Sequence, residues 1–166
     1  MDESASSLFE DDERLQHALA LAYRYLNRCE RTVAEVRTRL QRAAIPRDDA
    51  ERAIETLIEQ GSLDDQRFVQ LFVEDKRELD QWGSERIERA LLSRGVDGEL
   101  VREALSGAAS QSELDRALEV LRRRFPSPPA DRRERERALG VLLRKGYDSE
   151  LALDALMAYA RRAEAA

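Results

Sequence analysis

Apolar residues recur along most of this chain at steps of three and four positions, which is the spacing of an amphipathic α-helix. The first such stripe lies between about residues 12 and 29 and consists of Leu15, Leu19, Ala22 and Leu26. Comparable stripes follow almost to the end of the chain. The pattern therefore predicts an all-α protein in which each helix buries one face and exposes the other.

Characteristic capping residues mark where these helices begin and end. Thr32 and Glu35 have the spacing of a capping box, in which a hydroxyl and a carboxylate each accept a backbone N–H at the start of a helix. Pro46 fits the first turn of the following helix, where its missing N–H costs nothing, and Gly61 is placed to end that helix. Further along, Pro126 and the two prolines after it cannot continue a helix. We therefore expect helices separated by short turns.

The chain repeats one stretch of sequence at a constant offset. The residues LLSRGVDGELVREAL, which begin at Leu91, return 51 positions later as LLRKGYDSELALDAL, which begin at Leu142. A weaker copy, LQRAAIPRDDAERAI, begins 51 positions before the first of these, at Leu40, and keeps the same apolar positions. A fixed offset of this kind indicates tandem structural units. Together with the helical stripes it predicts three modules of three helices each.

The glycine and aspartate shared by the two strong copies have the properties of turn residues. Glycine tolerates the positive φ angle that ends a helix, and an aspartate two positions later can cap the next helix. These pairs are Gly95 with Asp97 and Gly146 with Asp148. The first copy has Ala44 at the glycine position, so we expect its turn to be built differently, with the nearby proline shaping it.

Composition limits how large a core the chain can form. Charged residues make up 37% of the 166 positions and aromatic residues only 5%, which favours small helical modules over one large core. A module of about 50 residues buries little surface alone, so neighbouring modules are expected to lean on each other in an elongated molecule that can curve. The expected divisions are an acidic, disordered tail at 1–13 and modules at 14–61, 62–107 and 108–166, with a hinge at 106–112.

The net charge of −6 conceals an uneven distribution. Residues 1–13 contain six acidic groups and no basic one, which leaves 28 acids and 28 bases in the rest of the chain. Between residues 122 and 145, nine bases outnumber three acids. The nine are the candidate partner-binding residues Arg122, Arg123, Arg124, Arg132, Arg133, Arg135, Arg137, Arg144 and Lys145. Two interpretations are open: a surface that meets phosphates or an acidic protein, or a solvated face of arginines paired along their own helix.

Side chains that catalyse reactions or bind metals are scarce. His17 is the only histidine and Cys29 the only cysteine, so the chain lacks the ligands of a zinc site and the disulfides of an oxidising compartment. Asp64 and Asp65 precede a helix, where carboxylates favour capping over metal binding, and Trp82 is expected to anchor packing between helices. No phosphate-binding loop or nucleophile elbow occurs. We expect neither an enzyme nor a cofactor.

The sequence also predicts no membrane association. There is no run of about 18 apolar residues, as a membrane-spanning helix requires. The segment MDESASSLFEDDE is acidic where a signal peptide is basic and then apolar. We therefore expect a cytoplasmic protein.

Four segments of the chain resemble the RecX family of regulatory proteins. They are YLNRCERTVAEVRTRL (25–40), LIEQGSLDDQRFVQLFVEDKREL (57–79), WGSERIERALLSRGVDGELVREAL (82–105) and RALGVLLRKGYDSELALDAL (137–156). They follow the family's order and cover nearly everything after the acidic segment. The central unit, with Gly61 to Asp65 followed by Arg67 and Phe68, is the most specific part, and the turn at Arg144 to Tyr147 also matches.

The resemblance implies three tandem three-helix modules, in agreement with the repeat. It further implies a non-enzymatic modulator of the RecA recombinase that lodges in the helical groove of RecA filaments on single-stranded DNA. Family members usually restrain RecA by limiting filament growth and by lowering its ATPase, strand-exchange and repressor-cleavage activities in recombination and the SOS response. The expected partner is thus the RecA filament, with weak direct DNA contact through the basic residues, and the protein is expected to be a monomer.

Two other functions are compatible with a helical repeat. The helix pairs joined at Gly95 and Gly146 have the turn length of a helix-turn-helix DNA-binding regulator. The helices that would read DNA carry acidic residues that repel phosphates, which disfavours this alternative. These acids are Glu99, Glu103, Glu150 and Asp154. The other possibility is a helical scaffold with no link to nucleic acid, and the resemblance argues against it.

Overall fold

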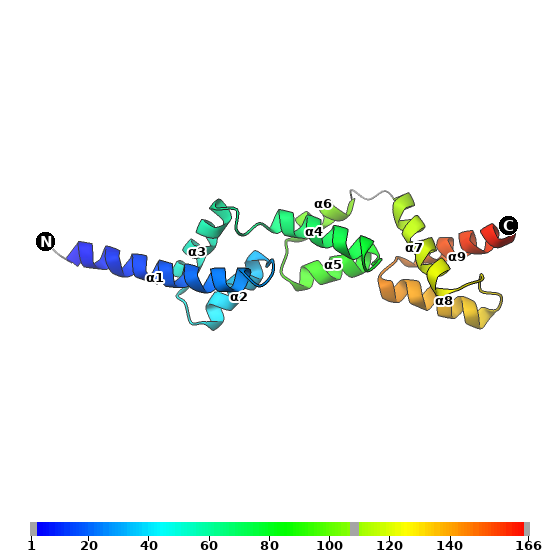
Figure 1. Ribbon diagram of the computed structural model, residues 1–166, viewed down its shortest axis with the longest axis horizontal. Coiled ribbons are helices and arrows are strands. Elements are labelled where there is room, and N and C mark those ends of the chain that lie inside the picture. Colours follow the sequence, from blue (N-terminus) through cyan, green and yellow to red (C-terminus); the bar gives the residue numbers. More distant parts are fainter. Residues whose placement is uncertain (1–2, 107–109, 165–166) are drawn as a thin grey trace. The chain divides into compact units, whose positions relative to one another are not determined.

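The computed structural model describes residues 3–106 and 110–164, and within these ranges the chain forms nine α-helices and no strand (Figure 1). In chain order they are α1 (Glu3–Leu26), α2 (Val33–Arg42), α3 (Arg47–Glu59), α4 (Asp65–Glu78), α5 (Ser84–Ser93), α6 (Gly98–Ser106), α7 (Ser110–Arg124), α8 (Arg132–Lys145) and α9 (Ser149–Glu164). The predicted all-α class and the three tandem three-helix modules, α1–α3, α4–α6 and α7–α9, are confirmed. None of the described helices is long and apolar enough to span a membrane.

The acidic segment at the start of the chain differs from our expectation. We expected residues 1–13 to be disordered, but α1 is helical from Glu3 onward. Alanine, leucine and glutamate, which have high helix propensity, make up five of the residues from Glu3 to Glu13, and Glu3 complements the positive end of the helix dipole. Residues 1 and 2 lie outside the described part of the chain, as do residues 107–109 of the expected hinge.

The chain divides into two compact units, which we describe separately. The first comprises the chain up to Phe68 together with Arg94–Val96. Its core is formed by small and branched side chains on one face each of α1, α2 and α3. The buried residues are Ala18, Leu19, Ala22, Val36, Leu40, Ala50, Ala53, Ile54, Leu57 and Leu63. The alanines let the helix backbones approach closely, while the leucines and isoleucine fill the remaining volume.

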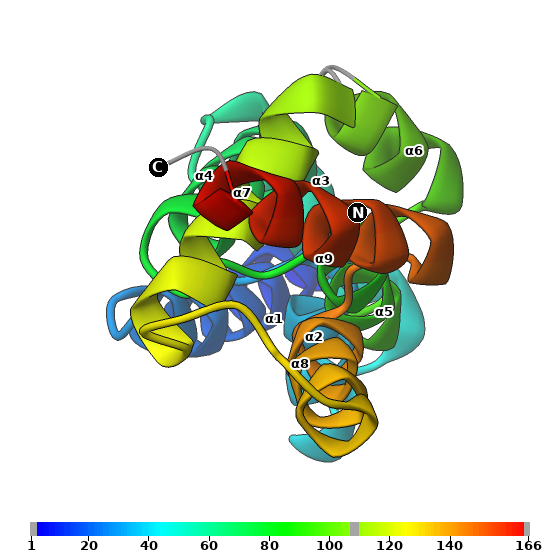
Figure 2. The same cartoon turned by 90° about the vertical axis from the view of Figure 1, so that its right-hand side faces the viewer.

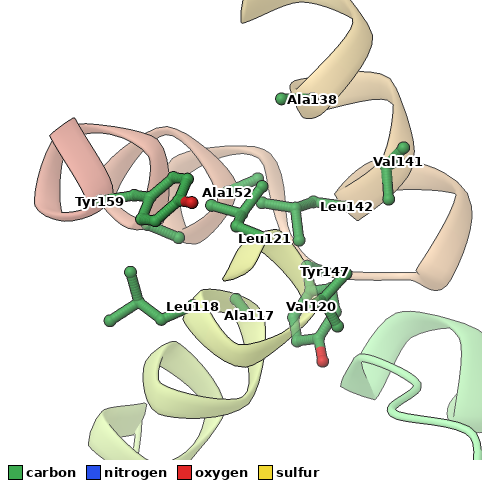
Figure 3. Close-up of a cluster of buried hydrophobic side chains, with 11 residues drawn as sticks. Ala117, Leu118, Val120, Leu121, Ala138, Val141, Leu142, Tyr147, Ala152 and Tyr159 are labelled. Carbon is green, nitrogen blue, oxygen red and sulfur yellow. The ribbon is translucent and has the colours of Figure 1, made fainter. Parts of the chain in front are cut away.

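The second unit comprises Val69–Ser93 and the chain from Asp97 onward. Its largest core lies among α7, α8 and α9, and both views show α7 and α9 packed against each other (Figures 1 and 2). Figure 3 shows these side chains converging from the three helices, with Tyr147 and Tyr159 as the largest members. Tyr147 is fully buried, and its hydroxyl donates a hydrogen bond to the carbonyl oxygen of Gln81 at 2.9 Å.

The capping residues act largely as the sequence predicts. The hydroxyl of Thr32 accepts the N–H of Glu35 at 3.2 Å, and the carboxylate of Glu35 accepts the N–H of Thr32 at 3.0 Å, so the capping box is complete. Asp64 accepts the N–H of Arg67 at 2.9 Å and so caps α4. Helix α7 ends at Arg124, before the proline-rich segment.

The turn that contains Ala44 was predicted incorrectly. Its φ angle is 59°, in the same left-handed region as Gly95 at 75° and Gly146 at 87°. The N–H of Ile45 donates to the carbonyl oxygen of Leu40 at 3.1 Å, as the equivalent backbone atoms do in the third module. The three turns therefore share one conformation, and Pro46 is simply the N-cap of α3. An alanine in this conformation carries about 1 kcal/mol of strain.

Candidate partner-binding surface

The nine candidate basic residues lie on two helices of the third module. Arg122, Arg123 and Arg124 form the last turn of α7, where positive side chains complement the negative end of the helix dipole. The other six lie along α8, and all nine except Lys145 are exposed. The proline-containing segment at 125–131 connects the two helices, so the basic residues of α7 and those of α8 belong to the same module.

Two of the three acids in this basic stretch are used to start α8. The carboxylate of Asp131 accepts the N–H of Glu134 at 2.7 Å. The carboxylate of Glu134 reaches back and accepts the N–H of Ala130 at 2.9 Å. Both groups satisfy backbone donors that a helix start leaves without partners, so neither forms an ion pair with the arginines.

Three of the arginines form ion pairs along their own helices. Arg132 Nε lies 2.8 Å from Glu136 Oε1 on α8. On α7, Glu119 is shared by Arg123 at 2.8 Å and Arg122 at 3.9 Å. The interpretation of a solvated, self-paired face therefore holds for these three. Exposed pairs of this kind contribute little to stability, about 0–1 kcal/mol each.

The remaining exposed arginines have no ion-pair partner among the described residues. Three of them, Arg133, Arg137 and Arg144, are spaced at i, i+4 and i+11 along α8, and so lie on one side of the helix over about 16 Å. Gly140 lies in the same row, and a β-carbon built there would be 3.1 Å from Nη1 of Arg144. We call Arg133, Arg137 and Arg144 the arginine face. It offers three unneutralised positive charges to a partner.

Lys145 does not belong to this surface. Its Nζ donates a hydrogen bond to the carbonyl oxygen of Asp80 at 2.7 Å, and the residue is half-buried. Burial, and then the positive charge of Arg86, lower the pKa of the Lys145 amine. Its geometry is that of a lysine that fastens the third module to the second.

This fastening is a backbone contact between the start of α5 and the turn after α8. The N–H of Gly83 donates to the carbonyl oxygen of Lys145 at 2.9 Å, and the N–H of Glu85 donates to that of Gly146 at 3.1 Å. A β-carbon at Gly83 would lie 2.3 Å from the Gly146 oxygen. Close approach therefore requires glycine at position 83, and Gly146 also has the positive φ angle of 87° that favours glycine.

Side chains surround this backbone contact. The N–H of Ser84 donates to Glu113 Oε1 at 2.7 Å. Two cations lie over the ring of Trp82, with the guanidinium carbon of Arg86 4.1 Å and the Nζ of Lys76 4.8 Å from its centroid. Such cation–π contacts add to packing, and they support the expectation that Trp82 anchors helices.

The first unit contains the equivalent contact 51 residues earlier. Thr32 and Arg94 stand 51 positions before Gly83 and Lys145. The hydroxyl of Thr32 donates a hydrogen bond to the carbonyl oxygen of Arg94 at 2.8 Å. A β-carbon at Gly95 would lie 2.4 Å from the Cβ of Ala34. Three repeat positions, those of Thr32 and Gly83, of Arg94 and Lys145, and of Gly95 and Gly146, therefore form both contacts. Each contact joins the turn after the second helix of one module to the start of the second helix of the module before it.

An ion pair closes this earlier contact. Arg94 donates two hydrogen bonds to Glu35, at 2.9 and 3.0 Å. Burial alone raises the pKa of Glu35, but the hydrogen bonds from Arg94 and from the Thr32 N–H outweigh it and leave the pKa lowered. Asp65 accepts the N–H of Val33 at 2.9 Å, and burial raises the pKa of its carboxyl.

Sequence reasoning did not identify these junctions. Their members are separated by about 60 positions, and no local motif links them. The available signal was the 51-residue offset itself, because it aligns Thr32 with Gly83 and Gly95 with Gly146.

The other candidate chemical groups lie apart from one another. His17 and Cys29 are both exposed, on α1 and after it. Within the described ranges, no three His, Cys, Asp or Glu side chains gather in a way that would hold a metal ion. The chemistry that the chain does present is positive charge on the third module.

Models of the RecX family match the chain in three places. The first RecX three-helix domain matches residues 18–57, the second matches residues 64–105 and the third matches residues 111–156. Each matched segment covers most of one three-helix module of the structure.

Relatives of known name show the same similarity. The regulatory protein RecX of Trichlorobacter lovleyi is 35% identical over 134 residues, which are 78% of this chain and 87% of the relative. The regulatory protein RecX of Mycobacterium avium is 30% identical over 151 residues, with 89% and 87% covered. The crystal structure of RecX from Lactobacillus salivarius matches 91% of this chain and 99% of its own with a TM-score of 0.79. At 19% identity that last likeness concerns the fold.

Proposed function

The chain belongs to the RecX family of regulatory proteins, and from this premise we propose that it binds the RecA filament on single-stranded DNA and restrains RecA. The activities expected to fall are ATP hydrolysis, strand exchange and stimulated repressor cleavage. The chain would act by occupying its partner's surface and not by catalysis, in line with a family of regulatory and typically non-enzymatic proteins. The scarcity of catalytic side chains fits this role.

The observation that best supports the proposal is the arginine face on α8. Arg133, Arg137 and Arg144 are exposed and have no ion-pair partner in the described part of the chain. A row of unneutralised cations attracts phosphate or carboxylate groups and speeds association with an acidic surface. A nucleoprotein filament presents both kinds of anion.

The repetition of three modules adds a second argument. A filament repeats the same subunit surface, and a protein made of tandem modules can contact successive subunits. Linked weak contacts strengthen one another because the second binding event is intramolecular. Tight binding then requires no deep pocket on any single module.

Reading of duplex DNA by a helix-turn-helix is the less favoured function. The acidic residues of α6 and α9 that would face DNA phosphates are exposed, and they are Glu99, Glu103, Glu150 and Asp154. Negative side chains there oppose binding to the DNA backbone.

A titration over salt concentration separates these functions. The full-length chain is added to labelled single-stranded DNA coated with RecA, to the same strand bare, and to a duplex. The proposal predicts tightest binding to the RecA-coated strand. Stronger binding to bare duplex than to the coated strand would contradict it and favour the helix-turn-helix alternative.

A further inference from the structure

A groove with an apolar floor runs between α8 and α9 on the outside of the third module. Its volume is about 510 Å³, and its lining includes Arg132, Arg135, Glu136, Leu139, Leu153 and Met157. Leu153 is 49% exposed and Met157 is 55% exposed. Large apolar side chains gathered at a groove are characteristic of a surface that a partner covers.

The internal repeat shows that the fold does not need apolar residues here. Leu139 and Leu153 correspond, 102 positions earlier, to Arg37 and Glu51. In the first module that pair forms an ion pair, with Arg37 Nε 2.6 Å from Glu51 Oε1. The equivalent pair of helices in the first module therefore folds with charges at these two positions, where the third module has the half-buried Leu139 and the exposed Leu153.

The second module agrees with the first. It carries Glu88 and Arg102 at the two leucine positions. The position of Met157 is occupied by Glu55 in the first module and by Ser106 in the second. Only the third module has an apolar surface at all three positions, so this surface is a property of that module and not of the repeat.

Positive charge borders the groove. Arg132 and Arg135 both line it, and the acid among the lining residues, Glu136, is already paired with Arg132. Arg135 makes no ion pair with any described residue. The groove therefore combines an apolar floor with an unneutralised positive edge.

We propose that this groove binds an amphipathic helix of the partner protein, one that carries apolar residues on one face and acidic residues beside them. The apolar face would cover Leu139, Leu153 and Met157, and a carboxylate would pair with Arg135. Helix-in-groove binding uses this combination of buried apolar anchors and flanking charge. The inference deepens the proposed function, since the partner tested is the RecA filament.

The composition of the groove distinguishes a protein helix from other occupants. Nucleic-acid phosphates would be attracted to Arg135, but they gain nothing from covering exposed leucine and methionine side chains. A second copy of the chain would bring its own charges, and such binding would appear as self-association. Both occupants are outcomes that the experiment below separates.

The test transplants residues of the first module into the groove. Leu153→Glu with Met157→Glu introduces the residues found at Glu51 and Glu55, which the repeat tolerates. Leu143→Gln is the control for the loss of an exposed leucine, because Leu143 is 41% exposed on α8 outside the groove and Gln41 occupies its position in the first module. Binding of each full-length protein to RecA-coated single-stranded DNA is measured, with circular dichroism to establish folding.

We expect the double variant to bind at least about tenfold more weakly, the scale on which central interface residues act, and the control to bind like the wild type. Arg135→Glu should also weaken binding and reduce its dependence on salt. Equal binding by the folded double variant overturns the groove proposal while the proposed function stands. Failure of the wild type to bind the filament overturns the proposed function itself.

Three further results would contradict the proposal in whole or in part. If the double variant lost affinity for bare single-stranded DNA to the same extent, the groove would be a nucleic-acid surface. If the wild type sedimented as a dimer and the double variant as a monomer, the groove would be an interface between copies of this chain. If Arg135→Glu bound as tightly as the wild type, the acidic character assigned to the partner helix would be wrong.

Discussion

Gly83 and Gly146 meet backbone to backbone, and a β-carbon on Gly83 would lie 2.3 Å from the carbonyl oxygen of Gly146. Neighbouring hydrogen bonds fix this approach, including that from the Gly83 N–H to the Lys145 carbonyl oxygen at 2.9 Å. The contact joins helix α5 of the second module to the turn after α8 in the third. It allows no side chain between them.

We predict that Gly83→Ala lowers the free energy of unfolding by about 1–3 kcal/mol, the usual cost of forcing extra volume into a packed site. Gly98→Ala is the control, since a β-carbon at Gly98 meets nothing closer than 3.8 Å. Urea unfolding followed by circular dichroism measures both. A Gly83→Ala protein as stable as the control would show that the two segments do not pack this closely in solution.

The turn positions allow a second comparison. Gly95→Ala places an alanine in the left-handed conformation and puts its β-carbon 2.4 Å from the Cβ of Ala34. The left-handed conformation alone costs an alanine about 1 kcal/mol, so with the added clash we expect the protein to lose more than about 1 kcal/mol of stability. Ala44 already has a φ angle of 59°, and Ala44→Gly relieves that strain. Gly also gains freedom in the unfolded chain, so the expected net change is within about 1 kcal/mol. Thermal unfolding measures both variants, and Gly95→Ala should lower the stability more than Ala44→Gly does. An equal effect of both would contradict the close approach at Gly95.

Much of the fold follows from local rules, whereas the junctions do not. The capping box at Thr32 and the helix end before Pro126 depend on a few adjacent residues, so the sequence predicts them. The contact of Thr32 with Arg94 depends on how whole helices pack, which no local pattern encodes. The left-handed Ala44 was mispredicted because a turn hydrogen bond to Leu40 outweighs a modest backbone preference.

The sequence predicted the candidate surface only in part, because the packing of α8 is not encoded in a local pattern. Charge counting identified the basic stretch, but it could not separate Arg133, which is unpaired among the described residues, from Arg132, which pairs with Glu136. Nor could it show that Lys145 turns inward to the Asp80 carbonyl oxygen. These distinctions depend on which side of α8 each residue occupies and on what packs there.

Tyr147 provides a prediction at high pH. Burial raises the pKa of its hydroxyl to about 12 from 10.0. The neutral form is therefore favoured in the folded state, and the resulting stability is fully present below pH 10 and lost as the pH rises through about 12. A shift of this size corresponds to roughly 2–3 kcal/mol.

The measurement is the unfolding free energy of wild type and Tyr147→Phe between pH 9 and pH 12. The wild type should lose stability relative to the variant across this range. Below pH 9 the variant should be less stable by about 1 kcal/mol, since it lacks the hydrogen bond to Gln81. A constant difference between the two proteins at all pH values would contradict burial of this hydroxyl.

Glu35 provides the complementary prediction at low pH. The pKa of its carboxyl is lowered from 4.5, because hydrogen bonds from Arg94 and the Thr32 N–H outweigh the effect of burial. A lowered folded-state pKa gives stability that is present above about pH 4.5 and lost as the pH falls through the folded-state value. We expect Glu35→Gln to cost about 1 kcal/mol at pH 7.

The difference between wild type and Glu35→Gln should shrink as the pH is lowered from 6 to 3. Glu51→Gln serves as the comparison: the hydrogen bond from Arg37 also lowers the pKa of Glu51, but that ion pair is more exposed than the pair of Glu35 with Arg94, so its effect should be smaller. A difference that stays constant, or grows, toward pH 3 would be incompatible with the ion pair between Glu35 and Arg94.

The proposed function is tested most directly by the rate of ATP hydrolysis by RecA on single-stranded DNA with increasing amounts of the full-length chain. The compared proteins are the wild type, an arginine-face variant with Arg133→Glu, Arg137→Glu and Arg144→Glu, and a control with the same change of charge at the exposed Arg39, Arg42 and Arg47. We expect wild type and control to lower the rate, and we expect the arginine-face variant to need at least about tenfold more protein for the same effect. Unchanged ATP hydrolysis with the wild type, or equal inhibition by all three folded proteins, would contradict this expectation.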